Sequence, residues 1–117
     1  MSFESQLFGI LQAACPRVFP DVAPLGAATP YLTWQQLGGE SLRFLDNTAP
    51  DKRNLLMQVN AWAKTRMEAT VLSRQIENAL CASALFIAIP EGEAISTYED
   101  DTLLYGCIQR LSIYAAR

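Results

Sequence analysis

The side chains of this chain that could do chemistry are mainly carboxylates and thiols, because the sequence contains no histidine. Without histidine there is no Ser-His or Cys-His nucleophile pair, most zinc sites are excluded, and the usual neutral-pH base is missing. Two groups of carboxylates remain as candidates for holding a hard cation or for acid–base work: Glu91 with Glu93, and Glu99 with Asp100 and Asp101.

Neither acidic group has the spacing of a known site. Glu99, Asp100 and Asp101 are consecutive, whereas a calcium loop needs D-x-D-x-D-G spacing. Glu91 and Glu93 flank a glycine at an expected tip, and a paired-carboxylate glycosidase needs a substrate cleft for which 117 residues leave little room. We therefore interpret both groups as solvated turns.

The three cysteines, Cys15, Cys81 and Cys107, are widely separated and lack C-x-x-C spacing. Their odd number favours free thiols in a reducing compartment. None lies near an expected helix N-terminus, where a thiolate would be stabilised, so we interpret all three as small core residues. The sequence thus predicts no catalytic, cofactor-binding or metal-binding residues, and a protein that is not an enzyme.

The composition indicates a globular chain, with half of its residues hydrophobic and 18% charged. Its length predicts one domain, residues 1–117. A net charge of -3 makes the chain a poor candidate for binding the phosphate backbone of nucleic acids. No basic leader and no apolar run of ~20 residues is visible, so we expect a soluble, cytoplasmic protein without a membrane partner.

The stretch from Asn54 to Cys81 carries the strongest structural signal. Apolar residues alternate from Asn54 to Trp62, as in a strand with one apolar and one mixed face. Thr65 and Glu68 then form a T-x-x-E capping box, and the period changes to the three-and-four spacing of an amphipathic helix. Lys64, Arg66 and Arg74 could form a small basic strip there, although solvated helix charges are the favoured interpretation.

The remaining elements pack around this unit. Ser2 caps a first helix that Pro16 ends, and an extended proline-rich connector follows to Pro30, tacked to the core by Val18, Phe19, Val22 and Leu25. Further strands are expected at 31–37, 85–89 and 103–114. Residues 94–98 either continue the strand at 85–89 past a bend at Pro90–Gly92 or form a loop arm.

The order α-β-β-α-β-β predicts an α+β fold, with one mostly antiparallel four-stranded sheet and both helices on one face. The other face would carry Trp62, Tyr114 and Trp34, which is more aromatic than a solvated face needs. Segment 40–52 is too long for a tight hairpin. It either orders on a partner or folds back on the core. We predict a partner interface formed by Leu42, Arg43, Phe44, Leu45 and Trp62.

Three stretches together resemble the small tail-completion proteins of long-tailed phages and prophages, of the tail-to-head joining or tail-terminator type. They are FPDVAPLGAATPYLTWQQLG, LLMQVNAWAKTRMEATVLSRQIENAL and YEDDTLLYGCIQRLSIYA. The segment QVNAWAKTRMEA carries most of the likeness. Asn60 departs from the acidic residue expected before Ala61-Trp62. No catalytic residues come with this resemblance.

The resemblance implies a structural protein that caps the tail tube and helps join it to the head connector. Such proteins form rings, typically hexamers, from subunits that are monomeric before assembly. The implied partners are further copies, the tail tube protein and head connector proteins, with DNA only passing through. The implied location is the host cytoplasm during assembly and then the virion tail.

We also hypothesise that Glu91, Glu93, Glu99, Asp100 and Asp101 face the channel, where like charge lets DNA slide. The alternative is a small cytoplasmic protein-binding module without catalytic activity, which recognises a partner through its sheet edge or long loop.

Overall fold

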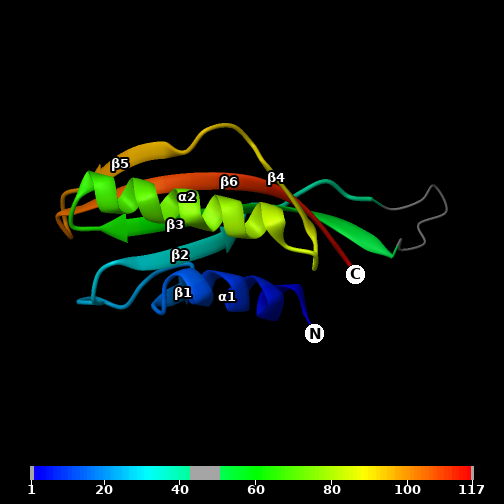
Figure 1. The fold of residues 1–117 in the computed structure, drawn as a ribbon, viewed down its shortest axis with the longest axis horizontal. Coiled ribbons are helices and arrows are strands. Elements are labelled where there is room, and N and C mark those ends of the chain that lie inside the picture. The colour runs from blue at the N-terminus through cyan, green and yellow to red at the C-terminus, as the bar shows by residue number, and fades with distance from the viewer. Residues whose placement is uncertain (1, 43–50, 117) are drawn as a thin grey trace.

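The computed structural model describes residues 2–42 and 51–116, which form two helices and one mixed sheet (Figure 1). The helices are α1 (Phe3–Ala14) and α2 (Arg66–Ala82). The strands are β1 (Val18–Pro20), β2 (Tyr31–Gln36), β3 (Lys52–Ala63), β4 (Ile87–Pro90), β5 (Ile95–Glu99) and β6 (Leu104–Ala116). The predicted α+β class is confirmed, but the sheet has six strands and not four.

The sheet has the order β1-β2-β3-β6-β4, and β5 pairs with β6 on the same side as β4. Every pair is antiparallel except β1 with β2. Since β3 and β4 both run antiparallel to β6, they run parallel to each other with β6 between them. The crossover through α2 therefore forms a split βαβ unit.

The first unpredicted strand, β1, lies inside the proline-rich connector. Val18 pairs with Leu32, and the Leu32 N–H donates to the Arg17 carbonyl at 2.9 Å. The strand stays short because Pro20 has no N–H to donate, which suits an edge position. The connector then leaves the core: Val22 is 79% and Leu25 100% exposed, so the expectation that both tack it down was wrong.

The second unpredicted strand, β5, continues the line of β4 after an interruption. Residues 91–94 lie opposite only Gln109 and Arg110, so the edge strand bulges there. The Glu91 N–H donates to the Arg110 carbonyl at 2.9 Å, and Gln109 Nε2 donates to the Gly92 carbonyl at 3.0 Å. These bonds hold the bulge to β6. Of the two predicted alternatives, the structure therefore confirms that the edge strand continues past a bend, and residues 94–98 do not form a loop arm.

The strand–helix unit forms as its period and caps predict. Thr65 is the N-cap of α2 and accepts a hydrogen bond from the Glu68 N–H at 3.2 Å, and Ser2 caps α1 in the same way. Lys52 and Arg53 extend β3 beyond the predicted start. No described helix is long and apolar enough to cross a membrane.

The main core lies between the helices and the inner face of the sheet. Leu7 and Leu11 of α1, with Ile76 and Leu80 of α2, pack over alternate residues of β2, β3 and β6. Trp34 also packs against this core, so it does not join Trp62 on the outer face. Two of the cysteines, at 15 and 107, are buried as predicted, but that at 81 is exposed, which corrects its interpretation as a core residue.

Truncation at the centre of this core is expected to be costly. Leu111 on β6 is fully buried, so Leu111→Ala should lower the free energy of unfolding by about 2–5 kcal/mol, since it leaves a cavity. Leu25→Ala, at a fully exposed leucine, should change it by less than about 0.5 kcal/mol. Urea unfolding of both variants measures the difference, and equal losses would contradict this placement of the core.

Candidate partner-binding groove on the outer sheet face

The outer face of the sheet, which the helices do not cover, carries the candidate site. Alternate residues of β3 point to this face, and the last of them, Trp62, pairs with Tyr31 of β2 on one side and Gly106 of β6 on the other. The period of two in β3 therefore places the tryptophan between two neighbouring strands, on the side away from the core.

The Trp62 indole spans these neighbours. Its Nε1 donates a hydrogen bond to Thr33 Oγ1 on β2 at 3.3 Å. Its six-membered ring lies over Gly106, because a Cβ added there would come within 2.6 Å of the Trp62 Cζ3 atom. Gly106 thus marks a close approach, and the approaching group is the indole. The combination of a tryptophan and a glycine on paired strands was the sequence signal that could have revealed this.

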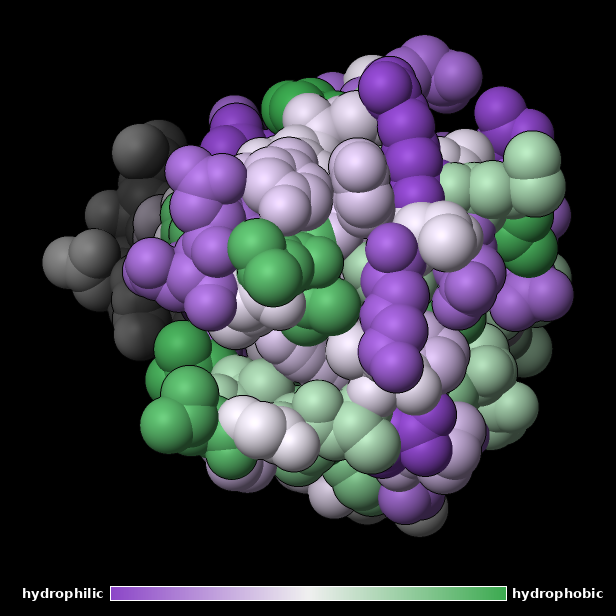
Figure 2. Space-filling view, turned by 90° about the vertical axis from the view of Figure 1, so that its left-hand side faces the viewer, coloured by the Kyte–Doolittle hydropathy of each residue, from purple (hydrophilic) through white to green (hydrophobic). Residues whose placement is uncertain are grey.

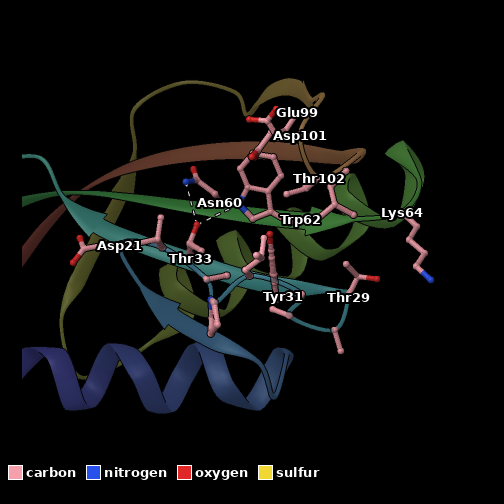
Figure 3. Close-up of a pocket in the computed structure, with 18 residues that line it drawn as sticks. Asp21, Thr29, Tyr31, Thr33, Asn60, Trp62, Lys64, Glu99, Asp101 and Thr102 are labelled. Carbon is pink, nitrogen blue, oxygen red and sulfur yellow. Dashed lines mark hydrogen bonds between the residues drawn. The ribbon is translucent and has the colours of Figure 1, made fainter.

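A groove opens beside the indole, with a volume of about 870 Å³ (Figure 3). Residues 21–29 of the connector form one wall, and residues of the β5–β6 turn form the opposite rim. Tyr31, Thr33, Asn60 and Trp62 line it from the outer sheet face. Asn60 Nδ2 donates to the same Thr33 Oγ1 at 3.3 Å, so a small hydrogen-bonded group holds the floor in place.

Carboxylates outnumber cations around the groove. Asp21, Glu99 and Asp101 line it, together with the ammonium of Lys64. Tyr31 is only 7% exposed, and its hydroxyl forms no hydrogen bond with any described residue. Burial, and secondly the negative charge of Glu99, raise the pKa of Tyr31 above its ordinary value. The groove is therefore a negatively charged, partly aromatic cavity.

Hydrogen-bond acceptors at this site outnumber the donors that reach them. Asn60 Oδ1 is buried and receives no hydrogen bond from a described residue. Within residues 2–42 and 51–116, no three or more carboxylate or thiol side chains gather in a way that could hold a metal ion. What the arrangement can do chemically is receive hydrogen-bond donors and positive charge beside an aromatic surface.

The structure brings together predicted residues that the sequence placed in separate sets. Trp62, predicted as a partner contact, shares the groove with Glu99 and Asp101, predicted as channel-facing. Asp100 is exposed in the same turn. The other two acidic residues, Glu91 and Glu93, are exposed in the bulge between β4 and β5, outside the groove.

Leu42, the other predicted interface residue that the structure describes, lies away from the groove. Leu42 is half-buried near the far end of the sheet, where the Glu40 N–H donates to Asn54 Oδ1 at 2.8 Å. Trp62 is eight strand positions from Asn54, or ~26 Å along β3. Arg43, Phe44 and Leu45 lie outside the described residues. Trp62 and Leu42 therefore lie toward opposite ends of the sheet.

A second, more polar groove of about 480 Å³ runs between α2 and the β5 edge. Arg66, Arg74, Glu77 and Glu93 line it, and Gln109 closes its floor. The two arginines of the basic strip thus lie on the helix layer, while the acidic groove lies on the opposite, outer face of the sheet.

Exposed apolar side chains surround the end of the molecule at which the acidic groove opens. Val22 and Leu25 come from the connector and Leu103 from the β5–β6 turn. Figure 2 looks onto this end and shows apolar groups set among polar ones. Apolar anchors interspersed with charge are typical of surfaces that contact other proteins.

Filling the space above Gly106 is expected to displace Trp62. Gly106→Ala should lower the free energy of unfolding by about 1–3 kcal/mol and change the tryptophan fluorescence, since the indole must move to admit the Cβ. Gly9→Ala is the control, because a Cβ there meets nothing within 4 Å and alanine favours the helix by about 0.5–1 kcal/mol. An unchanged Trp62 environment in Gly106→Ala would contradict the described packing.

Comparison with known proteins supplies the family. No curated protein sequence matches the chain significantly. The model of the family described as tail completion protein gp17 matches residues 5–115, a range that includes most of α1, all of α2, strands β1 to β5 and all but the last residue of β6. The predicted resemblance is confirmed: the chain belongs to the tail completion protein gp17 family, and its role is in phage tail assembly, in association with the virion tail.

Proposed function

We propose that this protein closes the end of the tail tube and joins it to the head connector, as a ring of identical copies. Subunits are monomers in the host cytoplasm before assembly, and the ring is a hexamer. Membership of a structural tail-completion family supports an assembly role without catalysis. The observation that carries the proposal is the uncovered outer face of the sheet, which exposes apolar residues along one whole side.

Three exposed isoleucines form an apolar stripe on this face. Ile87, Ile89 and Ile95 point outward from β4 and β5, and they are 58%, 48% and 54% exposed. Ile95 pairs with Ile108, whose other neighbour is Asn60 at the groove, so the apolar stripe and the groove belong to one continuous face. Exposed apolar surface of this extent indicates a partner.

A closed ring requires two different surfaces that fit each other. The outer sheet face supplies one. The helix layer on the opposite side supplies the other, since Met67 and Val71 are exposed one turn apart on α2. The ends of the ring then meet the tail tube protein and the head connector proteins.

The acidic residues of the edge suit the DNA path. Glu91 and Glu93 are exposed in the bulge, and Asp100 is exposed in the β5–β6 turn. Negative charge along a channel repels the DNA backbone, so DNA passes without binding.

The alternative, a small binding module, draws support from one observation. Strand β5 lies at the sheet edge, where a partner strand could be added. Incubation with purified tail tubes separates the two functions. Ring-shaped density at tube ends in electron micrographs supports the proposed function, and a chain that stays monomeric and never binds tubes favours the module.

A charge placed in the isoleucine stripe should block assembly. Ile89→Asp should reduce ring formation on tail tubes by about tenfold or more, because it would bury an unpaired carboxylate at the contact. Ile89→Val is the control, because it keeps an apolar, β-branched side chain at the same position. Native mass spectrometry measures both, and unaffected assembly of Ile89→Asp would rule out this face as a contact.

Reversing the charge of the bulge should slow DNA passage. The double variant Glu91→Lys, Glu93→Lys should join tails to heads normally but eject DNA more slowly, since lysines bind phosphates. The double variant Glu4→Lys, Glu40→Lys, at two exposed carboxylates outside the bulge, serves as the charge-matched control. The rate of DNA ejection is measured by DNA-dye fluorescence. An unchanged rate would contradict the placement of Glu91 and Glu93 in the channel.

A further inference from the structure

We propose that the acidic groove at Trp62 receives an arginine side chain, Arg74, from the neighbouring copy of this chain. The inference rests on the proposed ring and assigns its contact residues. It follows from the chemistry of the groove, from the placement of the arginines, and from the opposite positions of the two surfaces.

The groove has the composition of a guanidinium receptor. The half-buried Trp62 lines it and offers an aromatic surface, on which an arginine stacks more readily than a lysine. Glu99 and Asp101 lie beside the indole in Figure 3 and supply carboxylate oxygens. A guanidinium has five N–H donors in a planar fork, so it can pair with carboxylates while its face rests on the ring.

The floor of the groove adds a hydroxyl group that forms no hydrogen bond with a described residue. Tyr31 is over nine-tenths buried, and Figure 3 shows its hydroxyl directed toward Trp62. That hydroxyl forms no hydrogen bond within the described part of the chain, although it lies in the field of Glu99. A bound arginine would donate a hydrogen bond to it in place of solvent, which separates this site from a mere cluster of acidic residues.

Lys64, the cation that lines the groove, does not pair with the carboxylates Glu99 and Asp101. Lys64 lies at the rim, and its ammonium points away from Glu99 and Asp101 in Figure 3. No ion pair forms between these groups in the described structure. Among the described residues, the negative charge of the groove is therefore not neutralised by an ion pair.

The arginines of the described chain differ in how far their own contacts occupy them. Arg17 donates to the Pro30 carbonyl at 2.9 Å, and Arg110 donates to Gln58 Oε1 at 3.1 Å. Arg66 reaches Ser96 Oγ at 3.5 Å, and Arg53 is half-buried. Arg74 is exposed on α2 and has neither a hydrogen bond nor an ion pair with a described residue.

Arg74 cannot enter the groove of its own copy, because α2 covers the inner face and the groove lies on the outer face. A head-to-tail contact between copies places the helix layer of one against the outer face of the next. Charge complementarity then joins Arg74 to Glu99 and Asp101, while Met67 and Val71 meet the isoleucine stripe. This assignment leaves Glu91, Glu93 and Asp100 for the channel.

Carbodiimide cross-linking tests the contact directly. Arg74→Lys keeps the positive charge and provides an amine that carbodiimide joins to a nearby carboxylate as an amide. Rings are assembled on tail tubes from equal amounts of ¹⁴N- and ¹⁵N-labelled Arg74→Lys protein. We expect mass spectrometry to find position 74 of one chain linked to Glu99 or Asp101 of another. Gln12→Lys, on the exposed side of α1, is the control and should give no such link.

A charge exchange supplies the energetic test. Asp101→Arg and Arg74→Glu should each weaken self-association by about tenfold or more, and the two together should restore most of it. Trp62→Phe, which keeps an aromatic ring, should weaken association less than Trp62→Leu. Neither charge variant alters a buried residue, so far-ultraviolet circular dichroism should stay unchanged in both.

The outcomes separate the two proposals. Rings that form without a link between position 74 and the groove overturn the arginine contact and leave the proposed function standing. Links from the groove to the tail tube protein overturn the second copy as the occupant. Failure to form any oligomer on tail tubes overturns both proposals.

Discussion

The register between β3 and β6 is the constraint on which the rest of the structure depends. Twelve residue pairs join the two strands, from Lys52 with Ala116 to Ala63 with Tyr105. Side chains alternate between faces, so a slip of one residue would move the core side chains of one strand to the solvent face. The central apolar pairs, such as Leu55 with Ile113 and Met57 with Leu111, favour this register because a shift of one residue would remove one member of each pair from the core.

The same register also builds the groove. With the core pairs in place, Trp62 must lie opposite Gly106, the one residue on that strand without a Cβ to obstruct the indole. The indole then extends toward β2, where Thr33 accepts its N–H. The core and the partner surface are thus the two faces of the same pair of strands. Packing on the buried face therefore also fixes the positions of the groove residues on the outer face.

Signals local in the sequence predicted structure well, and those that depend on distant pairing did not. The period of β3 and the Thr65 cap of α2 are encoded by neighbouring residues, which is why both were predictable. Strand β1 forms only through the pairing of Val18 with Leu32. Strand β5 continues the sheet edge because the Gln109 side chain donates a hydrogen bond to the Gly92 carbonyl in the bulge. Trp62 and the acidic residues were each predicted, but their meeting was not, since Glu99 reaches Trp62 only through the pairing of β5 and β3 with β6.

The edge of the sheet indicates that contacts form through faces rather than by strand addition. An exposed edge strand invites pairing with other chains, and proteins prevent this with bulges, prolines and charges. The β4–β5 edge has all three: Pro90 ends β4, and the bulge that follows carries Glu91 and Glu93. The isoleucines stand on the adjoining face, where no such device protects them. A chain that blocks its edge but leaves its face apolar is suited to a closed assembly of defined size, because strand addition would continue indefinitely whereas a face-to-layer contact closes once the rotation is complete.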